Sequence, residues 1–421
     1  MTATTASPPV KPLALAEFIP LMGLLTALDA LCIDAMMPAL ADMGRDLHVA
    51  VPNDVQLIIA AMFLGIMIGQ TIGGPLSDAV GRKPAIYFGL GLYLTGTLIA
   101  MFAQTFPVML AARVLQGTGA SMPATIGTAL VRDLYQGAPM ARVMSFMGSV
   151  FIFVPVIAPL LGQGILLVGH WRWIFVMFFV LGFPASIWFA LRQPETLPPE
   201  QRHPVSLRRL WGALLEILRN RSAMGYSIAS GVFLGAFFGY LNASQQIFQG
   251  AYKTGAWFAV YYSACAATIG LAMYFNGRLV ERLGMHRLTC LGCAGMTAVS
   301  LLFLPVAYAY AGVPPLPLWM AFLLPMFFFI GIMFGNLNAI IMEPLGHIAG
   351  MASSMTAALT LGLSLPLGTL LGRSFDGTVL PIVQGFALLC GAALVVMLWT
   401  ERGWPADPGP AGPVAAHPSH G

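Results

Sequence analysis

Long stretches without a charged residue alternate with short polar segments along most of the chain. Val55–Ser77 is long enough for one membrane crossing, and Leu288–Met342, at 55 residues, is long enough for two. A transmembrane helix needs about 20 apolar residues. The Gly- and Pro-rich turn at 312–317 divides the longer stretch. The other charge-free stretches are Pro84–Ala112, Val114–Val131, Val143–Trp171, Trp173–Leu191, Ser222–Tyr252, Thr254–Gly277, Pro344–Gly372 and Gly377–Thr400.

The first apolar segment, Leu13–Leu40, is too long for a cleaved signal peptide and contains Glu17, Asp29 and Asp34. It predicts a retained first transmembrane helix. The stretch from Pro84 to Val131 divides near Gln104–Pro107, so the pattern predicts twelve spans in all.

The spans divide into six on each side of one hydrophilic segment. We expect a cytoplasmic N-terminal segment at 1–12, six-helix bundles at 13–192 and 222–401, a cytoplasmic linker at 193–221 and a disordered cytoplasmic tail at 402–421. Val205–Leu218 would form either an amphipathic helix on the membrane or a solvated linker, and the sequence leaves both open.

Composition supports an integral membrane protein. Of the 421 residues, 58% are hydrophobic and 9% are charged, whereas a soluble domain averages about 25% charged residues. This excludes soluble enzymes and disordered regulators. A net charge of +4 spread over this length forms no basic patch, so no nucleic-acid partner is expected. The five cysteines all lie in apolar stretches, and neither a disulfide framework nor a metal site is expected.

The distribution of Lys and Arg predicts the orientation. Of the 20 basic residues, 15 fall in segments on the side of both termini, 4 fall on the opposite side, and Arg113 lies inside a span. The positive-inside rule then places both termini in the cytoplasm.

An internal repeat relates the two halves. Gly74, Asp78 and Gly81 follow the second span, and Gly277, Glu281 and Gly284 follow the eighth at a constant offset of 203 residues. The recurrence at equivalent loops indicates a duplicated array of six plus six helices, which is typical of secondary transporters.

Six short motifs stand out along the chain: Gly74-x3-Asp78-x2-Gly81-Arg82-Lys83, Arg113-x2-Gln116-Gly117-x-Gly119-Ala120, Ile33-Asp34-x3-Pro38-Ala39-Leu40, Val131-Arg132-Asp133-Leu134-Tyr135, Pro194-Glu195-Thr196-Leu197 and His347-x-Ala349-Gly350-x-Ala352-Ser353-Ser354. Together they resemble the major facilitator superfamily, and more narrowly its twelve-span drug:proton antiporters of Bcr/CflA type, which export multiple drugs and chloramphenicol. The resemblance covers about residues 14 to 400.

The resemblance implies an all-α membrane protein in which twelve helices form two pseudo-symmetric six-helix bundles. It also implies export of small amphipathic drugs, phenicols among them, by alternating access across a bacterial inner membrane. The partners would be the drug, protons and the lipid bilayer. We expect a monomer without a cofactor, driven by the proton gradient.

Charges within spans are costly and are candidates for function. Asp34 and Arg113 would each lie about 9 Å below the outer surface, which predicts a direct contact or a shared water. Asp29 would lie about 7.5 Å deeper and point elsewhere. We expect Asp34, or else Asp29, to carry the coupled proton beside Arg113. The alternative is a structural ion pair between Asp34 and Arg113.

Polar residues in apolar helices are candidates for substrate binding. Besides Asp29, Asp34 and Arg113, this set contains Gln116, Asn242, Gln245, Gln246 and Asn338. The same side chains would serve equally well as hydrogen-bond partners between helices.

Conformational gating is expected at the first repeated loop and in the fifth span. The loop residues are Gly74, Asp78, Gly81, Arg82 and Lys83, whose charges would form contacts that differ between conformations. The alternative is a turn that only orients the protein. Pro155 and Pro159 would kink the fifth span.

Other functions fit less well. Transport of a metabolite, such as a sugar or polyamine, remains the main alternative on the same scaffold. A membrane-embedded enzyme would need an H-E-x-x-H motif, a usable G-x-S-x-G elbow or paired metal ligands, and the sequence offers none. A sensor would normally carry a soluble domain. There is no G-x-x-x-x-G-K-[ST] loop for ATP, so an ion gradient is expected to supply the energy.

Overall fold

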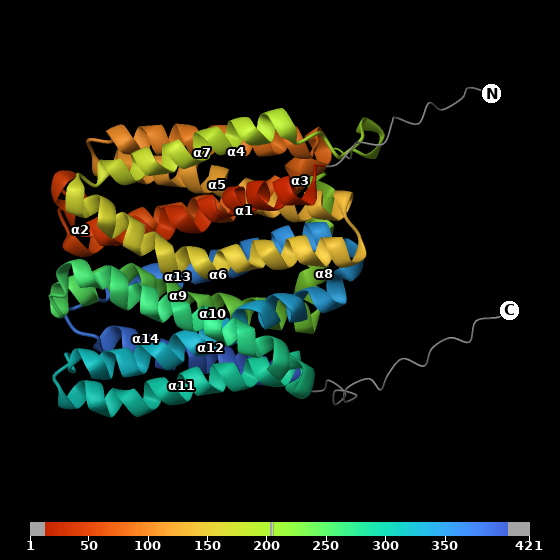
Figure 1. Cartoon of the computed structure of the whole chain (residues 1–421). Helices are drawn as coiled ribbons and strands as arrows, with labels where there is room; N and C mark the ends of the chain where they lie inside the picture. The colour runs from red at the N-terminus through yellow and green to blue at the C-terminus, as the bar shows by residue number, and fades with distance from the viewer. Residues whose placement is uncertain (1–12, 203, 205, 403–421) are drawn as a thin grey trace, which may run out of the picture.

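The computed structural model describes residues 13–202, 204 and 206–402, and this part of the chain is almost entirely helical. Twelve long helices run side by side along one direction (Figure 1). The first six are α1 (Leu15–Asp34), α3 (Leu57–Val80), α4 (Arg82–Phe102), α5 (Phe106–Leu134), α6 (Gly137–Val168) and α7 (Arg172–Arg192). The second six are α9 (Arg221–Gln245), α10 (Phe258–Leu283), α11 (Met285–Ala309), α12 (Leu316–Met342), α13 (Ala349–Arg373) and α14 (Leu380–Glu401).

Short helices connect them at the ends of the bundle. These are η1 (Met37–Ala39), α2 (Leu40–Asp46), η2 (Pro52–Gln56), η3 (Pro199–Gln201), α8 (Leu207–Arg219), the π-helix η4 (Gln246–Ala251), η5 (Gly255–Trp257) and η6 (Glu343–Ile348). Among the described residues, 11 helical segments are long and apolar enough to cross a membrane. The remaining long helix, α5, is less apolar because it contains Arg113, Gln116 and several Gly, Ser and Thr residues. The predicted all-helical membrane architecture is confirmed.

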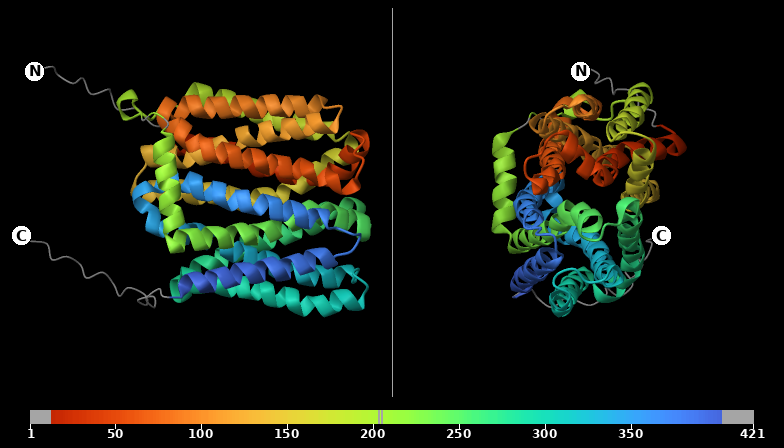
Figure 2. Two further views of the ribbon diagram at one scale, coloured as in Figure 1. Left: turned by 180° about the vertical axis from the view of Figure 1, so that it is seen from behind. Right: turned by 90° about the vertical axis from the view of Figure 1, so that its left-hand side faces the viewer.

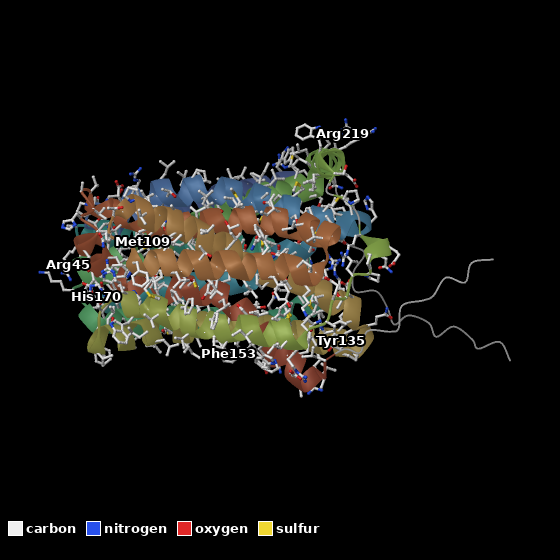
Figure 3. All side chains as sticks on the ribbon, turned by 90° about the horizontal axis from the view of Figure 1, so that it is seen from above. Arg45, Met109, Tyr135, Phe153, His170 and Arg219 are labelled. Atoms are coloured by element: carbon white, nitrogen blue, oxygen red, sulfur yellow. The ribbon has the colours of Figure 1, made fainter. Side chains whose placement is uncertain are left out.

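The bundle has two distinct ends. The described chain begins and finishes at one of them, which we call the terminal end, and α2 lies at the other, the far end (Figure 1). In the side-chain view, Arg45 and His170 lie at the far end, while Tyr135 and Arg219 lie at the terminal end (Figure 3).

The two halves pack in matching ways. In the first half, α1 packs on α6, α3 on α5, and α4 on α7; in the second half the equivalent pairs are α9 with α13, α10 with α12, and α11 with α14. Between the halves, α3 packs on α13 and α6 on α10. The repeated loops match as well, because Gly81 ends α3 and Gly284 ends α10 with φ values of 110° and 75°. Positive φ is accessible to glycine at little cost, which explains the residue at both positions.

The first span differs from the prediction of one helix over 13–40. Helix α1 ends at Asp34, and the chain continues through η1 and α2. Pro38 has no backbone N–H to continue the helical bonding, and its ring disfavours a helical conformation before it. Asp34 therefore lies at the end of a helix rather than within one.

The linker contains helix α8, and the location of this helix on the membrane stays a prediction. Helix α8 runs across the long helices at the terminal end (Figure 2). Ile217 is fully buried in a cluster with Leu345 and Ala352, and a carboxylate oxygen of Glu216 lies 2.6 Å from Nε2 of His347. The end of the linker is thus fixed on the second half. The N-terminal segment 1–12 and nearly all of the expected disordered tail lie outside the described residues.

Helices α3 and α5 approach each other through glycines. A Cβ atom added at Gly117 would overlap the carbonyl oxygen of Met62, and one added at Gly65 would overlap that of Val114. Small residues at such contacts let helix backbones pack closely within a membrane. This accounts for Gly117 in the motif that follows Arg113.

We expect Gly117→Ala to destabilise the protein by about 2 kcal/mol, because the added methyl group overpacks the α3–α5 contact. The matched control is Gly91→Ala in α4, where an added Cβ meets nothing within 4 Å. This control should be neutral or slightly stabilising. Thermal denaturation in detergent, followed by size-exclusion chromatography, measures both variants. Equal melting midpoints would contradict the proposed packing role of Gly117.

Candidate functional site

Two carboxylates are buried near the end of α1. Asp29 is 5% exposed and Asp34 is 6% exposed. One oxygen of Asp34, Oδ1, accepts a hydrogen bond of 2.9 Å from the hydroxyl of Tyr262 on α10. Because α10 belongs to the second half, this bond joins the two halves. It does so through Asp34, the residue that the sequence predicts to carry the coupled proton.

Asp29 is less well satisfied than Asp34. Its Oδ1 atom is buried and has no hydrogen-bond partner in the described part of the chain. Neither aspartate forms an ion pair with a basic side chain among the described residues. Burying an ionised carboxylate without such a partner costs free energy, and binding a proton relieves that cost.

The predicted direct contact between Asp34 and Arg113 is wrong for this structure. The fully buried guanidinium donates to the carbonyl oxygen of Cys32 at 2.8 Å and to Oε1 of Gln116. It also lies 5.9 Å from the ring centroid of Phe175. The last carbonyl groups of a helix lack intrahelical partners and attract cations. Arg113 thus caps the end of α1 where the helix breaks.

Gln116 extends this contact to a further helix. Its Nε2 donates to Oγ1 of Thr97 on α4 at 2.8 Å and lies 3.5 Å from Sγ of Cys32. Arg113 and Gln116 together connect α1, α4 and α5. In this structure they hold the first half together.

The other predicted polar residues differ in their surroundings. Asn242 donates to the carbonyl of Gly368 at 3.3 Å, and Gln245 donates to Gln249 at 2.7 Å. Asn338 is exposed on α12. Near it, Asn336 and Asn276 exchange two hydrogen bonds of 2.8 and 3.1 Å between α12 and α10. Asn242 and Asn336 thus agree with the interpretation as partners between helices, whereas Gln245 bonds along its own helical run and Asn338 stays a candidate for substrate binding.

Gln246 belongs to a polar group that joins the halves at the far end. Its Nε2 donates to Oδ1 of Asn53 at 3.1 Å, and Asn53 donates to the carbonyls of Arg373 and Phe375 at 3.1 and 2.8 Å. The guanidinium of Arg373 forms an ion pair with Asp54. We call Asn53, Asp54, Gln246 and Arg373 the far-end cluster. Of these four residues, only Gln246 is a candidate from the sequence, because the other three belong to no motif.

The first repeated loop forms a second polar group at the terminal end. Arg82 donates to Oγ of Ser77 at 2.8 Å, forms an ion pair with Asp78, and reaches Asp133 on α5 at 3.0 Å. The carboxylate of Glu195 accepts from the backbone N–H groups of Arg82 and Lys83 at 3.0 and 3.1 Å. Glu195 therefore caps α4, where a negative charge is favoured. We call this group the Arg82 cluster.

The remaining gating candidates lie in α3, α4 and α6. Lys83 donates to the carbonyl of Ala190 at 2.9 Å, which joins the loop to α7. Gly74 lies on the contact with α13, since a Cβ there would be 2.9 Å from Oγ of Ser354. Pro155 and Pro159 lie inside α6, which packs on both α1 and α10.

Sequence comparison identifies the family. A profile described as the Major Facilitator Superfamily matches residues 22–365. The chain is 25% identical to a bicyclomycin resistance protein homolog of Haemophilus influenzae over 90% of this chain and 94% of that protein. It is 27% identical to multidrug resistance protein D of Escherichia coli over the same shares.

Structural comparison agrees with the sequence. The partially occluded, inward-open xylose transporter XylE from E. coli aligns with a TM-score of 0.71 at 13% identity, over 93% of this chain and 98% of that one. This likeness concerns the fold. The twelve helices, the repeated loop and the profile match agree, and the chain belongs to the Major Facilitator Superfamily of membrane transporters.

Proposed function

We propose that this transporter is a proton-coupled exporter of small amphipathic drugs, including antibiotics such as phenicols, of Bcr/CflA type. The observation that carries the proposal is the pair of buried aspartates at the end of α1, one of which is bonded to the opposite half. The names of the two relatives, which refer to bicyclomycin and multidrug resistance, support the drug as substrate.

A proton-coupled exchanger needs a carboxyl group whose charge differs between conformations. In the proposed cycle Asp34, or else Asp29, takes a proton when the site faces the periplasm and releases it toward the cytoplasm. Drug binding favours the ionised form, so proton and drug compete for one site. Arg113 does not neutralise either aspartate here, which leaves both carboxyl groups available for a proton.

The distribution of Lys and Arg supports an inner-membrane orientation with both termini in the cytoplasm. The far end then faces the periplasm, and the far-end cluster closes the path on that side. Movement of the two halves about the site would break this cluster and open the outward path. In this scheme the Arg82 cluster acts at the cytoplasmic end, where it holds α3, α4, α5 and the linker together.

The substrate would lie between the halves near Asp34. Gln116, Asn242, Gln245 and Asn338 stay in the proposed substrate-binding set. In this conformation Gln116 and Asn242 bond to neighbouring helices, and Gln245 bonds to Gln249 one turn further along the chain. The 25 Met and 27 Phe residues supply adaptable apolar side chains, which suit substrates of varied shape. No cofactor is required by this scheme.

We expect the wild-type chain to raise the minimum inhibitory concentration of at least one phenicol or other antibiotic in a bacterium that lacks its main efflux pumps. Asp34→Asn should return resistance to the level of the empty vector, because an amide cannot exchange the coupled proton. Asp42→Asn is the matched control, since the side chain of Asp42 is 42% exposed and its ion pair is with Arg45 of the same short helix.

Membrane levels of all three proteins are compared by immunoblot. Full resistance in the Asp34→Asn strain would contradict the role of Asp34 and would make Asp29 the candidate for the coupled proton. If the wild-type protein is well expressed but protects against no compound, transport of a metabolite becomes the better proposal.

A second prediction concerns closure at the far end. We expect Arg373→Gln to raise the rate at which an impermeant maleimide labels a cysteine introduced at Val55, which is 6% exposed beside the far-end cluster. Loss of a partly exposed ion pair costs about 1 kcal/mol, so the rate should rise by about fivefold.

Arg45→Gln is the control, because it also removes an arginine at the far end. The ion pair of Arg45 is with Asp42 of the same short helix and does not join the halves. The exchange of both partners, Asp54→Arg with Arg373→Asp, should bring the labelling rate back toward that of the wild type. An unchanged rate in Arg373→Gln would show that the ion pair does not hold the far end closed.

A further inference from the structure

Tyr262 is the buried donor that reaches Asp34 from the second half. It lies four residues after the start of α10 and is 3% exposed. Its hydroxyl donates to Asp34 at 2.9 Å, and its ring packs 5.8 Å from the ring of Phe258. Nothing in the sequence singles out this residue, because it stands in an apolar helix next to another tyrosine.

The surroundings of Asp34 offer few other polar partners among the described residues. On its own helix Asp29 is the nearest acid, and on α5 Arg113 is engaged by Cys32 and Gln116. The charged residue of α6 is Arg142, at the terminal end, and Arg172 of α7 bonds to Ala103 at the far end. The hydroxyl of Tyr262 is therefore the group placed to respond to the charge on Asp34.

We infer that Tyr262 is a positioning residue through which the second half detects the ionisation of Asp34 and closes the far end. This inference rests on the proposed function only in assigning the coupled proton to Asp34. A hydrogen bond to an ionised carboxylate is about twice as strong as one to a neutral carboxyl group. Ionised Asp34 thus holds α10 against α1, and a proton on Asp34 weakens that hold.

The location of the bond fits this role. Asp34 is the last residue of α1, and Tyr262 lies about 6 Å along α10 from its first residue at the far end. The far-end cluster joins η2 to η4 and α13, whereas the bond between Tyr262 and Asp34 joins α1 to α10. The two sets of contacts therefore join different helices of the two halves, and both lie at the far end of the bundle.

The test measures distances between the halves directly and needs no substrate. Spin labels are attached through Arg45→Cys and Ala256→Cys, two exposed far-end positions in different halves, after the five native cysteines are replaced. Electron paramagnetic resonance then gives the distance distribution in nanodiscs between pH 5 and pH 8. In the otherwise wild-type protein, acid should shift the population toward the longer distance.

In Tyr262→Phe the longer distance should dominate across the whole pH range, with the ratio of open to closed forms at pH 8 raised by about tenfold. Tyr261→Phe is the matched control, because the ring of Tyr261 stacks on Phe248 and should leave the pH response unchanged. Asp34→Asn should also abolish the pH response, and the effects of Tyr262→Phe and Asp34→Asn should not add in the double variant.

A wild-type pH response retained in Tyr262→Phe, or additive effects in the double variant, would overturn the inference. If Tyr262→Phe fails to fold, Asp34→Asn tests the inference by itself. A wild-type pH response in Asp34→Asn would show that Asp34 is not the group whose ionisation is detected. Drug resistance is measured separately. Failure to transport any drug would reject the proposed substrate. The distance measurement would still test the role of Tyr262 by itself.

Discussion

The end of helix α1 at Asp34 is the constraint on which the rest of the site depends. A helix that stops among buried side chains leaves backbone carbonyl groups without partners, and burial away from water makes such groups costly. Arg113 satisfies one of them, at Cys32, and is thereby held away from the aspartates. The same break places Asp34 where α10 can reach it and lets the backbone of α6 approach closely at Gly162, where a Cβ would overlap the carbonyl oxygen of Ala35.

Contacts within a half differ in kind from contacts between halves. Helices α3 and α5 meet through glycines at backbone distance, a packing that leaves no room for movement. In the described part of the chain, the halves are joined by the packing of α3 on α13 and of α6 on α10, by side-chain hydrogen bonds and one ion pair at the far end, and by stacked rings of Phe63 and Phe238 at 4.1 Å. Such contacts can separate without unfolding a helix, which is the arrangement required of two rigid bodies that move against each other.

The sequence predicts the helices and their order because membrane thickness sets the length of each apolar run. It also predicts the matching loops, since the positive φ values at Gly81 and Gly284, 110° and 75°, favour glycine. The direction of the Arg113 side chain is beyond such reasoning, because it depends on a helix break that one proline causes inside an apolar run. The roles of Tyr262 and Asn53 cannot be predicted from the sequence either, since each residue bonds to a partner more than 190 residues away in the chain.

Glu195 gives the linker a defined length. Its carboxylate fixes the start of the linker on α4 of the first half, and helix α8 fixes the end of the linker on the second half. Nine residues, 198 to 206, lie between these two attachments, and nine residues span at most about 30 Å. The linker is thus a short tether whose contour length limits how far the halves can separate at the terminal end, and shortening it would restrict that separation without altering any residue near Asp34.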